Sequence, residues 1–244
     1  MNAIEPLFHI VIPCAGSGSR AGLSAPKQYV MLAGKPLVVH TLEAFSQLPG
    51  LGFGVLVTSP GDSQIDDIFS KWPQPQFTIS PTGGATRAQS VLAGLRALEI
   101  NGVNPGEWVL VHDAARCLVT PELILRLLQA CSNDQVGGLL ALALPDTLKT
   151  ESNGRVATTV DRSGKWLAQT PQMFKLGMLI EALSTAGYQV TDESSAIEAM
   201  GYAPVLVPSA SFNFKVTYAE DMQLAQNVLL SRSEFQQLNS ITNE

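Results

Sequence analysis

The chain has 244 residues, of which 45% are hydrophobic and 15% charged, so we expect one large α/β domain with a sizeable buried core. Lys and Arg number 15 against 21 Asp and Glu residues, which gives a net charge of −6. A nucleic-acid surface requires a basic face, so we expect no nucleic acid partner. An anionic ligand must then be held by a local cluster of cations.

The sequence contains no apolar run long enough to span a bilayer, and its start lacks the basic-then-apolar order of a signal peptide. The cysteines form no C-x-x-C pair, which is typical of reduced thiols; they are Cys14, Cys117 and Cys131. We therefore expect a cytoplasmic protein with no membrane partner.

Segments typical of strands alternate with segments typical of helices. Most of the strand candidates are unbroken apolar runs rich in β-branched residues, as expected for strands covered on both faces. They are residues 8–13, 53–59, 76–80, 108–113, 137–146, 155–160, 204–208 and 212–217. The alternation predicts an α/β fold with a doubly wound, mostly parallel sheet, in a single domain over residues 1–244.

Helix signals lie between these strands. Apolar residues at i, i+3, i+4 and i+7 predict a buried helical stripe made of Ala88, Val91, Leu92, Leu95 and Leu98. Thr120 is a candidate N-cap, followed by Pro121 at the first helical position and Glu122 in the first turn. Thr217 with Glu220 predicts a capping box that opens a last helix of about fifteen residues.

Residues at about 142–166 break the alternation with two strand-like stretches around the turn signal Ser152-Asn153-Gly154. No helix intervenes, so this region is predicted to be a β-hairpin arm that protrudes from the α/β body. Such an arm needs a covering surface, and a second subunit is the natural candidate. We therefore expect a homodimer formed through the arm.

The stretch from His9 to Lys27 predicts a polyphosphate site. It reads as a strand that ends at Pro13, followed by a loop of small residues and glycines with two cations, Arg20 and Lys27, and no acid. Glycines let backbone N–H groups approach an anion closely, and paired cations suit a polyphosphate better than a neutral ligand. The interpretation is a nucleotide triphosphate site at the carboxyl end of the first strand.

A structural turn and a dinucleotide loop are the alternatives. Gly16, Gly18 and Gly22 loosely match the dinucleotide fingerprint, so an NADP-dependent oxidoreductase is a competitor. A Rossmann loop should run straight into a helix, whereas Pro26 breaks a helix before it can form, and no acid for a ribose follows the strand that ends near Ser59. A surface turn would leave the paired cations unexplained. A Walker loop is excluded because no G-K-[ST] is present.

Two further clusters follow predicted strands. His112-Asp113-Ala114-Ala115-Arg116 comes after a buried strand, where ligands bind in doubly wound sheets. Asp113 can hold a divalent metal that bridges phosphates, and Arg116 can hold a phosphate or the acid itself; the alternative is a solvated loop. Gly83 and Gly84 precede a helix that begins near Thr86, and a helix N-terminus binds anions; a plain helix cap explains the glycines equally well but does not require Arg87.

Polar clusters also stand at strand and helix ends, and each alone is more often a turn or a cap than a site. They are Asp146-Thr147, Asp161-Arg162, Thr170-Pro171-Gln172, Thr191-Asp192-Glu193 and Lys215-Val216-Thr217.

Together these clusters resemble the 2-C-methyl-D-erythritol 4-phosphate cytidylyltransferases of the non-mevalonate isoprenoid pathway. The resemblance runs from about residue 8 to residue 230, through PCAGSGSR, APKQY, GGATRAQSV, HDAAR, DT-K, TVDR, TPQ, TDE and KVT in that order. It implies a Rossmann-like nucleotidyltransferase that joins CTP to 2-C-methyl-D-erythritol 4-phosphate, releases pyrophosphate and uses Mg2+ or another divalent cation.

The resemblance also assigns roles to residues. The catalytic cations would be Arg20, Lys27 and Lys215. The nucleotide would be bound by Pro13, Cys14, Ala15, Gly16, Ser17, Gly18, Gly83, Gly84, Arg87, Ser90, Asp113 and Ala114, with Asp113 also holding the metal. The acceptor would be bound by Arg116, Thr147, Arg162, Thr170 and Thr191. In the family, arm residues reach the site of a neighbouring subunit, which agrees with the predicted arm.

Two rival functions remain open. A sister enzyme that makes CDP-ribitol from ribitol 5-phosphate would share the CTP half and differ around Thr147, Arg162 and Thr191. A catalytically silent nucleotide-binding protein would lose Arg20 or Lys27, and both are present. Cys14 and Cys117 are further predicted to lie close together at the mouth of the site, where their oxidation could impair CTP binding.

Overall fold

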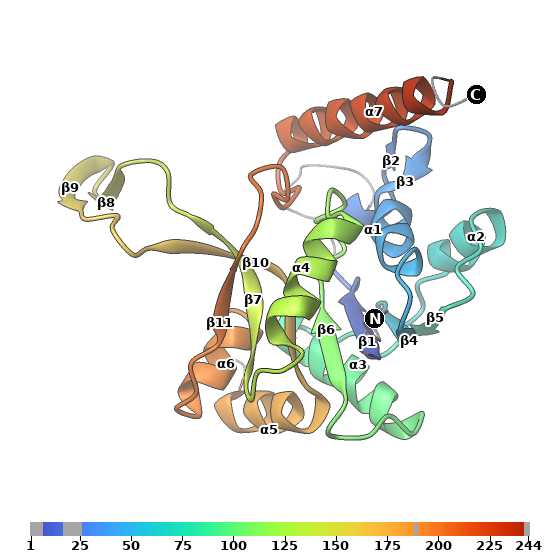
Figure 1. The fold of residues 1–244 in the computed structure, drawn as a ribbon, viewed down its shortest axis with the longest axis horizontal. Helices are drawn as coiled ribbons and strands as arrows, with labels where there is room; N and C mark the ends of the chain where they lie inside the picture. The colour runs from blue at the N-terminus through green and yellow to red at the C-terminus, as the bar shows by residue number, and fades with distance from the viewer. Residues whose placement is uncertain (1–6, 17–25, 188–189, 242–244) are drawn as a thin grey trace.

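The computed structural model describes residues 7–16, 26–187 and 190–241, and Figure 1 shows their arrangement. Seven strands form one sheet in the order β11-β7-β10-β6-β1-β4-β5. Neighbouring strands run parallel, except that β10 is antiparallel to both β6 and β7. The strands are β1 (Phe8–Pro13), β4 (Leu51–Val57), β5 (Phe77–Ser80), β6 (Trp108–Val111), β7 (Gly137–Ala143), β10 (Trp166–Lys175) and β11 (Val205–Pro208).

Two hydrophobic clusters cover the two faces of this sheet. Successive side chains of a strand point to opposite faces, so Ile10 and Ile12 of β1 pack in one cluster and Val11 packs in the other. The first cluster is closed by α1 (Leu37–Ser46), α2 (Gln64–Lys71) and α4 (Pro121–Cys131), and the second by α3 (Arg87–Ile100), α5 (Leu176–Ala186) and α6 (Glu193–Ala199). The predicted doubly wound, mostly parallel α/β fold is therefore confirmed.

Helices α3 and α4 begin where the sequence predicted. The Thr86 hydroxyl accepts a hydrogen bond from the N–H of Gln89, whose side chain accepts one from the N–H of Thr86, so the two residues form a capping box. The Thr120 side chain accepts a hydrogen bond from the N–H of Leu123, with Pro121 in the first turn. These caps fix the helix starts that follow the Gly83-Gly84 and HDAAR loops.

The predicted capping box of the last helix is wrong. Helix α7 (Ala219–Ile241) begins two residues after Thr217 and runs for 23 residues. The carboxylate that reaches back belongs to Asp221, which accepts hydrogen bonds from the N–H groups of Thr217 (2.7 Å) and Tyr218 (2.8 Å). The Thr217 hydroxyl donates instead to the carbonyl of Lys215, at 3.1 Å. Two adjacent acids made the sequence pattern ambiguous, and the second one is used.

Two strand predictions need correction. Residues 212–217 form no strand, because Phe212, Phe214 and Val216 pack against a hydrophobic cluster and pair with no neighbouring strand. The N–H of Val216 is anchored on the carbonyl of Ala115 at 2.9 Å, so this irregular segment crosses over the carboxyl end of β6. Strand β10 was not predicted, because polar residues and a proline interrupt its apolar pattern at Gln169-Thr170-Pro171-Gln172.

The predicted hairpin arm is confirmed. Strands β8 (Leu148–Ser152) and β9 (Arg155–Val160) pair antiparallel in a sheet of their own and stand clear of the body (Figure 1). Asn153 and Gly154 have φ of 53° and 73°, and a two-residue turn with both φ positive matches the twist of a hairpin. The ends of the predicted range belong to the main sheet, where Ala143 of β7 pairs with Trp166 of β10.

The segment between β1 and α1 contributes to the edge of the site. It contains a 3-10 turn, η2 (Lys27–Tyr29), and a small hairpin of β2 (Met31–Leu32) and β3 (Lys35–Pro36). Within residues 7–16, 26–187 and 190–241, no helix has both the length and the apolar character that crossing a membrane requires.

Candidate active site

A pocket of about 500 Å³ opens beyond the carboxyl ends of β1 and β6. Its described lining comes from the end of β1, the η2 turn, the start of α3, the loop after β6 and the irregular segment before α7. The predicted residues that it includes are Pro13, Cys14, Ala15, Gly16, Lys27, Gly84, Arg87, Ser90, Asp113, Ala114 and Lys215. Ser17, Gly18 and Arg20 lie outside the described residues.

Gly83 lies beside this pocket and does not line it. A Cβ at Gly83 would overlap the Cβ of Ala15 and the carbonyl oxygen of Thr58, so only glycine lets this loop approach the end of β1 so closely. Ser90 holds the same loop, since its hydroxyl accepts a hydrogen bond from the N–H of Gly84 and donates one to the carbonyl of Thr86, both at 3.1 Å. Both residues therefore shape the pocket wall.

A second hollow of about 250 Å³ adjoins the first. The two share Arg87, Asp113 and Lys215, so they meet at the Asp113 carboxylate. Of the predicted acceptor residues, the second hollow is lined by Arg116, Thr170 and Thr191. Thr147 and Arg162 are not brought into it; they are exposed and flank the two arm strands, at the end where Leu148 pairs with Val160.

Asp113 is the centre of an ion-pair cluster. Its Oδ1 lies 2.7 Å from Nε of Arg87, its Oδ2 lies 2.7 Å from Nζ of Lys215, and Nε of Arg116 is 3.9 Å from Oδ2. Burial by itself would raise the pKa of Asp113, but the positive charges of Arg87 and then Lys215 outweigh burial and hold that pKa well below its ordinary value. Asp113 is therefore a carboxylate at neutral pH.

Arg87 links the two halves of the site. Besides Asp113 it binds Glu193 at the start of α6 through two parallel hydrogen bonds, Nη1 to Oε1 at 2.6 Å and Nη2 to Oε2 at 3.0 Å. Glu193 is fully buried, and this bidentate partner replaces the hydration that its carboxylate loses. Burial would lower the pKa of Arg87, but Glu193 and Asp113 raise it above its ordinary value. Each of its three guanidinium nitrogens donates one hydrogen bond to these acids, which leaves a second N–H on Nη1 and on Nη2, and a direct contact between Arg87 and a nucleotide stays a prediction.

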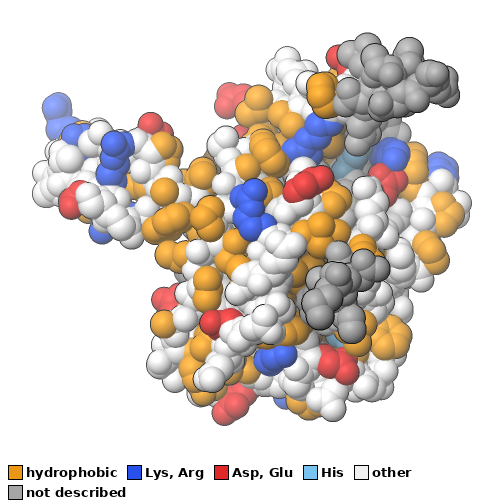
Figure 2. All heavy atoms as spheres, in the orientation of Figure 1, with side chains coloured by type: hydrophobic (Ala, Val, Ile, Leu, Met, Phe, Trp, Pro, Cys, Tyr) orange, Lys and Arg blue, Asp and Glu red, His pale blue; other side chains and the backbone are white. Residues whose placement is uncertain are grey.

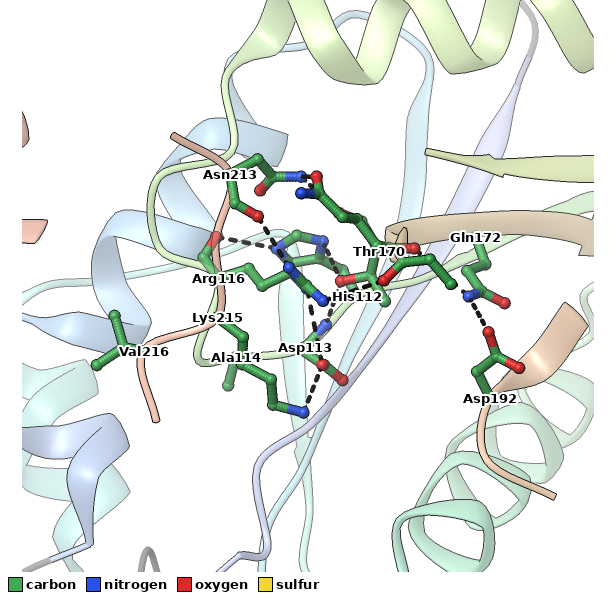
Figure 3. A network of polar contacts seen from close by, with 12 residues as sticks. His112, Asp113, Ala114, Arg116, Thr170, Gln172, Asp192, Asn213, Lys215 and Val216 are labelled. Carbon is green, nitrogen blue, oxygen red and sulfur yellow. Dashed lines mark hydrogen bonds and ion pairs between the residues drawn. The ribbon is translucent and has the colours of Figure 1, made fainter. Parts of the chain in front are cut away.

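The two predicted catalytic lysines approach the pocket from different segments and meet at Val216. Lys27, at the start of η2, donates from Nζ to the carbonyl of Val216 at 2.8 Å. Lys215 is the preceding residue of that segment, and Figure 3 shows its side chain directed at Asp113. The segment that was wrongly predicted as a strand therefore orients both lysines.

Behind Asp113, the polar side chains of the HDAAR and TPQ motifs form one network (Figure 3). The Thr170 hydroxyl lies 3.1 Å from both the backbone N of Asp113 and Nδ1 of His112. Nε2 of His112 lies 3.2 Å from the carbonyl of Arg116, which makes Nε2 the protonated nitrogen and Nδ1 the acceptor. Burial lowers the pKa of His112 to about 3, so the ring is neutral and structural.

Arg116 reaches into the second hollow from this network. Its Nη1 donates to the carbonyl of Asn213 at 2.8 Å. Among the described residues its Nε is a buried donor without a hydrogen-bond partner. That Nε faces the Asp113 carboxylate, 3.9 Å from Oδ2, and Arg116 also lines the hollow, where its positive charge favours an anionic ligand.

Sequence reasoning missed three residues that hold the site together. Glu193 anchors Arg87, and Gln28 donates to the backbone after β1. Gln172 donates to Asp192 at 2.8 Å and accepts a hydrogen bond from the N–H of Ser194 at 2.7 Å. All three lie inside the motifs TDE, TPQ and APKQY. The sequence signal that could have identified them is a glutamate or glutamine within two residues of a predicted site residue.

Comparisons with known proteins agree with this geometry. Residues 8–231 match the family model of the 2-C-methyl-D-erythritol 4-phosphate cytidylyltransferases. The chain is 48% identical over 227 residues to the enzyme of that name from Chromobacterium violaceum, which covers 92% of this chain and 99% of the relative. It is 56% identical over 228 residues to a bifunctional IspD/IspF enzyme of Albidiferax ferrireducens; that match covers 93% of this chain and spans about half, 54%, of the relative.

Solved structures give the same result. A crystal structure of a 4-diphosphocytidyl-2C-methyl-D-erythritol synthase superposes with a TM-score of 0.82 at 36% identity, covering 93% of this chain and 100% of the other. The Francisella tularensis 2-C-methyl-D-erythritol 4-phosphate cytidylyltransferase superposes with a TM-score of 0.76 at 31% identity, covering 90% and 98%. On its sequence, its fold and its pocket, this chain belongs to the 2-C-methyl-D-erythritol 4-phosphate cytidylyltransferase family.

Proposed function

We infer that this chain is a cytidylyltransferase that transfers a cytidylyl group from CTP to 2-C-methyl-D-erythritol 4-phosphate, releasing pyrophosphate in isoprenoid precursor biosynthesis. The observation that carries this assignment is the meeting of two hollows at Asp113, where cations from three separate segments converge. A reaction that joins two phosphorylated substrates requires such a junction. No observation favours ribitol 5-phosphate as the acceptor.

The larger hollow accounts for CTP. Ala15, Gly16 and Lys27 line the end of the pocket that follows β1, where the triphosphate would lie, and Ser90 and Gly84 line the wall at α3. Lys27 and Lys215 would neutralise the charge that develops on the α-phosphate and on the leaving pyrophosphate. Arg20 is proposed to act with them on the family pattern.

The smaller hollow accounts for the acceptor. Arg116 and Thr191 line it, and the positive charge of Arg116 suits a phosphate. The acceptor phosphate attacks the α-phosphorus of CTP: a P–O bond forms there, the P–O bond to the β-phosphate breaks, and pyrophosphate leaves with the electron pair. The attacking oxygen is already anionic at neutral pH, so no general base is needed. Catalysis then consists of positioning and electrostatic stabilisation by the cations.

We propose Mg2+ as the cofactor, held at Asp113. Among the described residues, no group of three or more His, Cys, Asp or Glu side chains is arranged to hold a metal ion. Both oxygens of the Asp113 carboxylate are paired with cations, Arg87 and Lys215, so Mg2+ would have to share or displace these partners, and substrate phosphates would complete its coordination. The bound metal would supply further neutralisation of the triphosphate.

We also propose that the protein is a homodimer in which the arm of each subunit completes the site of the other. Hydrophobic side chains gather where the arm leaves the body (Figure 2), where Trp166 and Leu167 are exposed, and Val156 is exposed near the turn of the arm. Thr147 and Arg162 stand exposed at the same junction. A cytoplasmic location is proposed with this assembly, supported by three free, buried cysteines.

The test is pyrophosphate release from CTP and Mg2+, measured in parallel with methylerythritol phosphate and with ribitol 5-phosphate. We expect release with the first acceptor only, and a loss of about 10²–10³-fold in rate for Lys27→Ala, by analogy with the removal of one oxyanion donor. Release with ribitol 5-phosphate instead would keep the CTP site and overturn the acceptor. Bound CTP without turnover by either acceptor would overturn the assignment as an enzyme.

A further inference from the structure

Three consecutive backbone carbonyls after β1 accept hydrogen bonds from side chains of other segments. The amide Nε2 of Gln28 donates to the carbonyl oxygens of Cys14, at 2.9 Å, and Gly16, at 3.0 Å. The hydroxyl of Ser59, just after β4, donates to the carbonyl oxygen of Ala15 at 2.9 Å. Gln28 is only 5% exposed, so water does not compete strongly for these contacts.

The N–H groups that share a peptide bond with the carbonyls of Cys14 and Ala15 are, by contrast, not hydrogen-bonded within the described residues. In a trans peptide the C=O and N–H point to opposite sides, so holding the carbonyls of Cys14 and Ala15 fixes the directions of the next two N–H groups. Across the described residues, the N–H groups of Ala15 and Gly16 have no hydrogen-bond partner, whereas that of Cys14 is bound to the carbonyl of Val57 at 2.7 Å. Both residues line the larger hollow, and a Cβ at Gly16 would meet no atom within 4 Å.

We propose that Gln28 and Ser59 are positioning residues for a polyphosphate ligand. By occupying three carbonyl oxygens they neutralise partial negative charge beside the anion and keep two successive N–H groups available to it. The proposal rests on the proposed function only in taking the triphosphate of CTP as that polyphosphate. A purely structural Gln28 would satisfy its buried amide in the same way but would not favour a polyanion over the acceptor.

Kinetics separate the two roles. Gln28→Glu keeps the size of the side chain and replaces the amide donor by a carboxylate beside two carbonyl oxygens. We expect the KM for CTP to rise about tenfold or more, with the KM for the acceptor unchanged. Ser59→Ala, a milder change, should raise the KM for CTP about threefold, and Ser59→Thr, which keeps a hydroxyl, should restore it.

Matched controls exist in the same chain. Gln76 and Ser70 also donate to backbone carbonyls, those of Ser46 (3.4 Å) and Asp67 (2.8 Å), and neither lines the hollow. Gln76→Glu and Ser70→Ala should therefore leave both KM values at the wild-type level. If Gln28→Glu and Ser59→Ala raise both KM values equally and lower the melting temperature, Gln28 and Ser59 only stabilise the fold, and the proposal is overturned.

Calorimetric titration with inorganic tripolyphosphate tests the same proposal without turnover. We expect the wild-type protein to bind it and Gln28→Glu to bind it more weakly, by about the factor seen in the KM for CTP. Equal binding by the two proteins, or no binding by the wild-type protein, would overturn the proposal. If the wild-type protein binds tripolyphosphate but does not turn over CTP, the proposed function fails, and the difference between the variants still decides the role of Gln28.

Discussion

The proposed acceptor residues fall into two groups with opposite surroundings. Arg116 and Thr170, on the body, are held by hydrogen bonds to the backbone and to His112. Thr147 and Arg162, at the arm, are exposed and line neither hollow. The body residues are therefore held in place within one chain, whereas the proposed arm ligands would need another surface to act on the acceptor.

Of the changes that compare the body with the arm, Glu193→Gln should have the largest effect, because it disrupts contacts made within one chain and lowers both stability and rate. Arg87 would lose half of its charge pairing beside the Asp113 carboxylate, and a buried group left unsatisfied costs about 1–3 kcal/mol. We expect both a lower free energy of unfolding, measured in urea, and a slower rate of pyrophosphate release, by about tenfold or more. Glu198→Gln is the matched control, since Glu198 is exposed on the same helix. Equal behaviour of the two variants would show that the Arg87 pair does not hold the site.

Arg162→Ala should affect the arm in a different way. Because Arg162 is exposed, the free energy of unfolding should stay unchanged, while the KM for the acceptor should rise about tenfold through the loss of a charged phosphate contact. Arg155→Ala, at the turn end of β9, is the control and should leave both quantities unchanged.

Mixing variants decides which chain Arg162 serves. In a mixed dimer of Arg162→Ala and Lys27→Ala subunits, one of the two sites combines an intact body with an intact arm. With the acceptor well below its wild-type KM, random exchange of subunits should then recover about a quarter of wild-type activity from two proteins that each retain about a tenth or less. A mixture no more active than the average of its components would place Arg162 in the site of its own chain.

The pH dependence of stability should report the network in the body. Burial lowers the pKa of His112 from 6.5 to about 3. Between about pH 3 and pH 6.5 His112 is therefore protonated in the unfolded chain and neutral in the folded chain. The free energy of unfolding should therefore fall as the pH is lowered from about 6.5 toward 3. His112→Gln should show a smaller loss between pH 7 and pH 5 in urea titrations. An unchanged loss would assign the effect to other groups, of which His40, with its pKa also lowered by burial, is the first to examine.

The smallest effect is expected at the cysteines. Cys14 and Cys117 are each 2% exposed, and burial raises the pKa of both thiols to about 12, so almost no reactive thiolate exists at neutral pH. The sequence-based suggestion that their oxidation impairs CTP binding is therefore disfavoured. Activity should survive mild peroxide treatment, and alkylation should be fast only in denaturant. Rapid alkylation of the folded protein would contradict the burial of these thiols.

The sequence could predict which residues gather at the site, because parallel strands bring their carboxyl ends to one edge. Asp113 after β6 and Ala15 after β1 follow from that rule. The sequence could not predict which of these side chains form ion pairs or hydrogen bonds with one another. Arg87 and Glu193 lie 106 residues apart, and their pairing depends on how α3 and α6 pack on one face of the sheet.

The strand that escaped prediction shows the same limit. In β10, Thr170 and Gln172 interrupt the apolar pattern because their side chains serve the polar network and not the core. Conversely, the apolar alternation of Phe212, Phe214 and Val216 suggested a strand where the chain only packs. The local pattern of apolar residues indicates which side chains are buried. In these two segments, burial and strand pairing do not coincide.

The register at the root of the arm has an engineering consequence. Ala143 pairs with Trp166, and the N–H of Leu144 donates to the carbonyl of Lys165 at 3.0 Å, so β7 and β10 are themselves a hairpin and the arm is its enlarged loop. Residues 144–165 can therefore be replaced by a two-residue Asn-Gly turn without breaking any strand of the main sheet. Such a shortened chain would separate folding from the proposed assembly, because the proposed contact with a second copy resides in one loop that can be removed without rebuilding the domain.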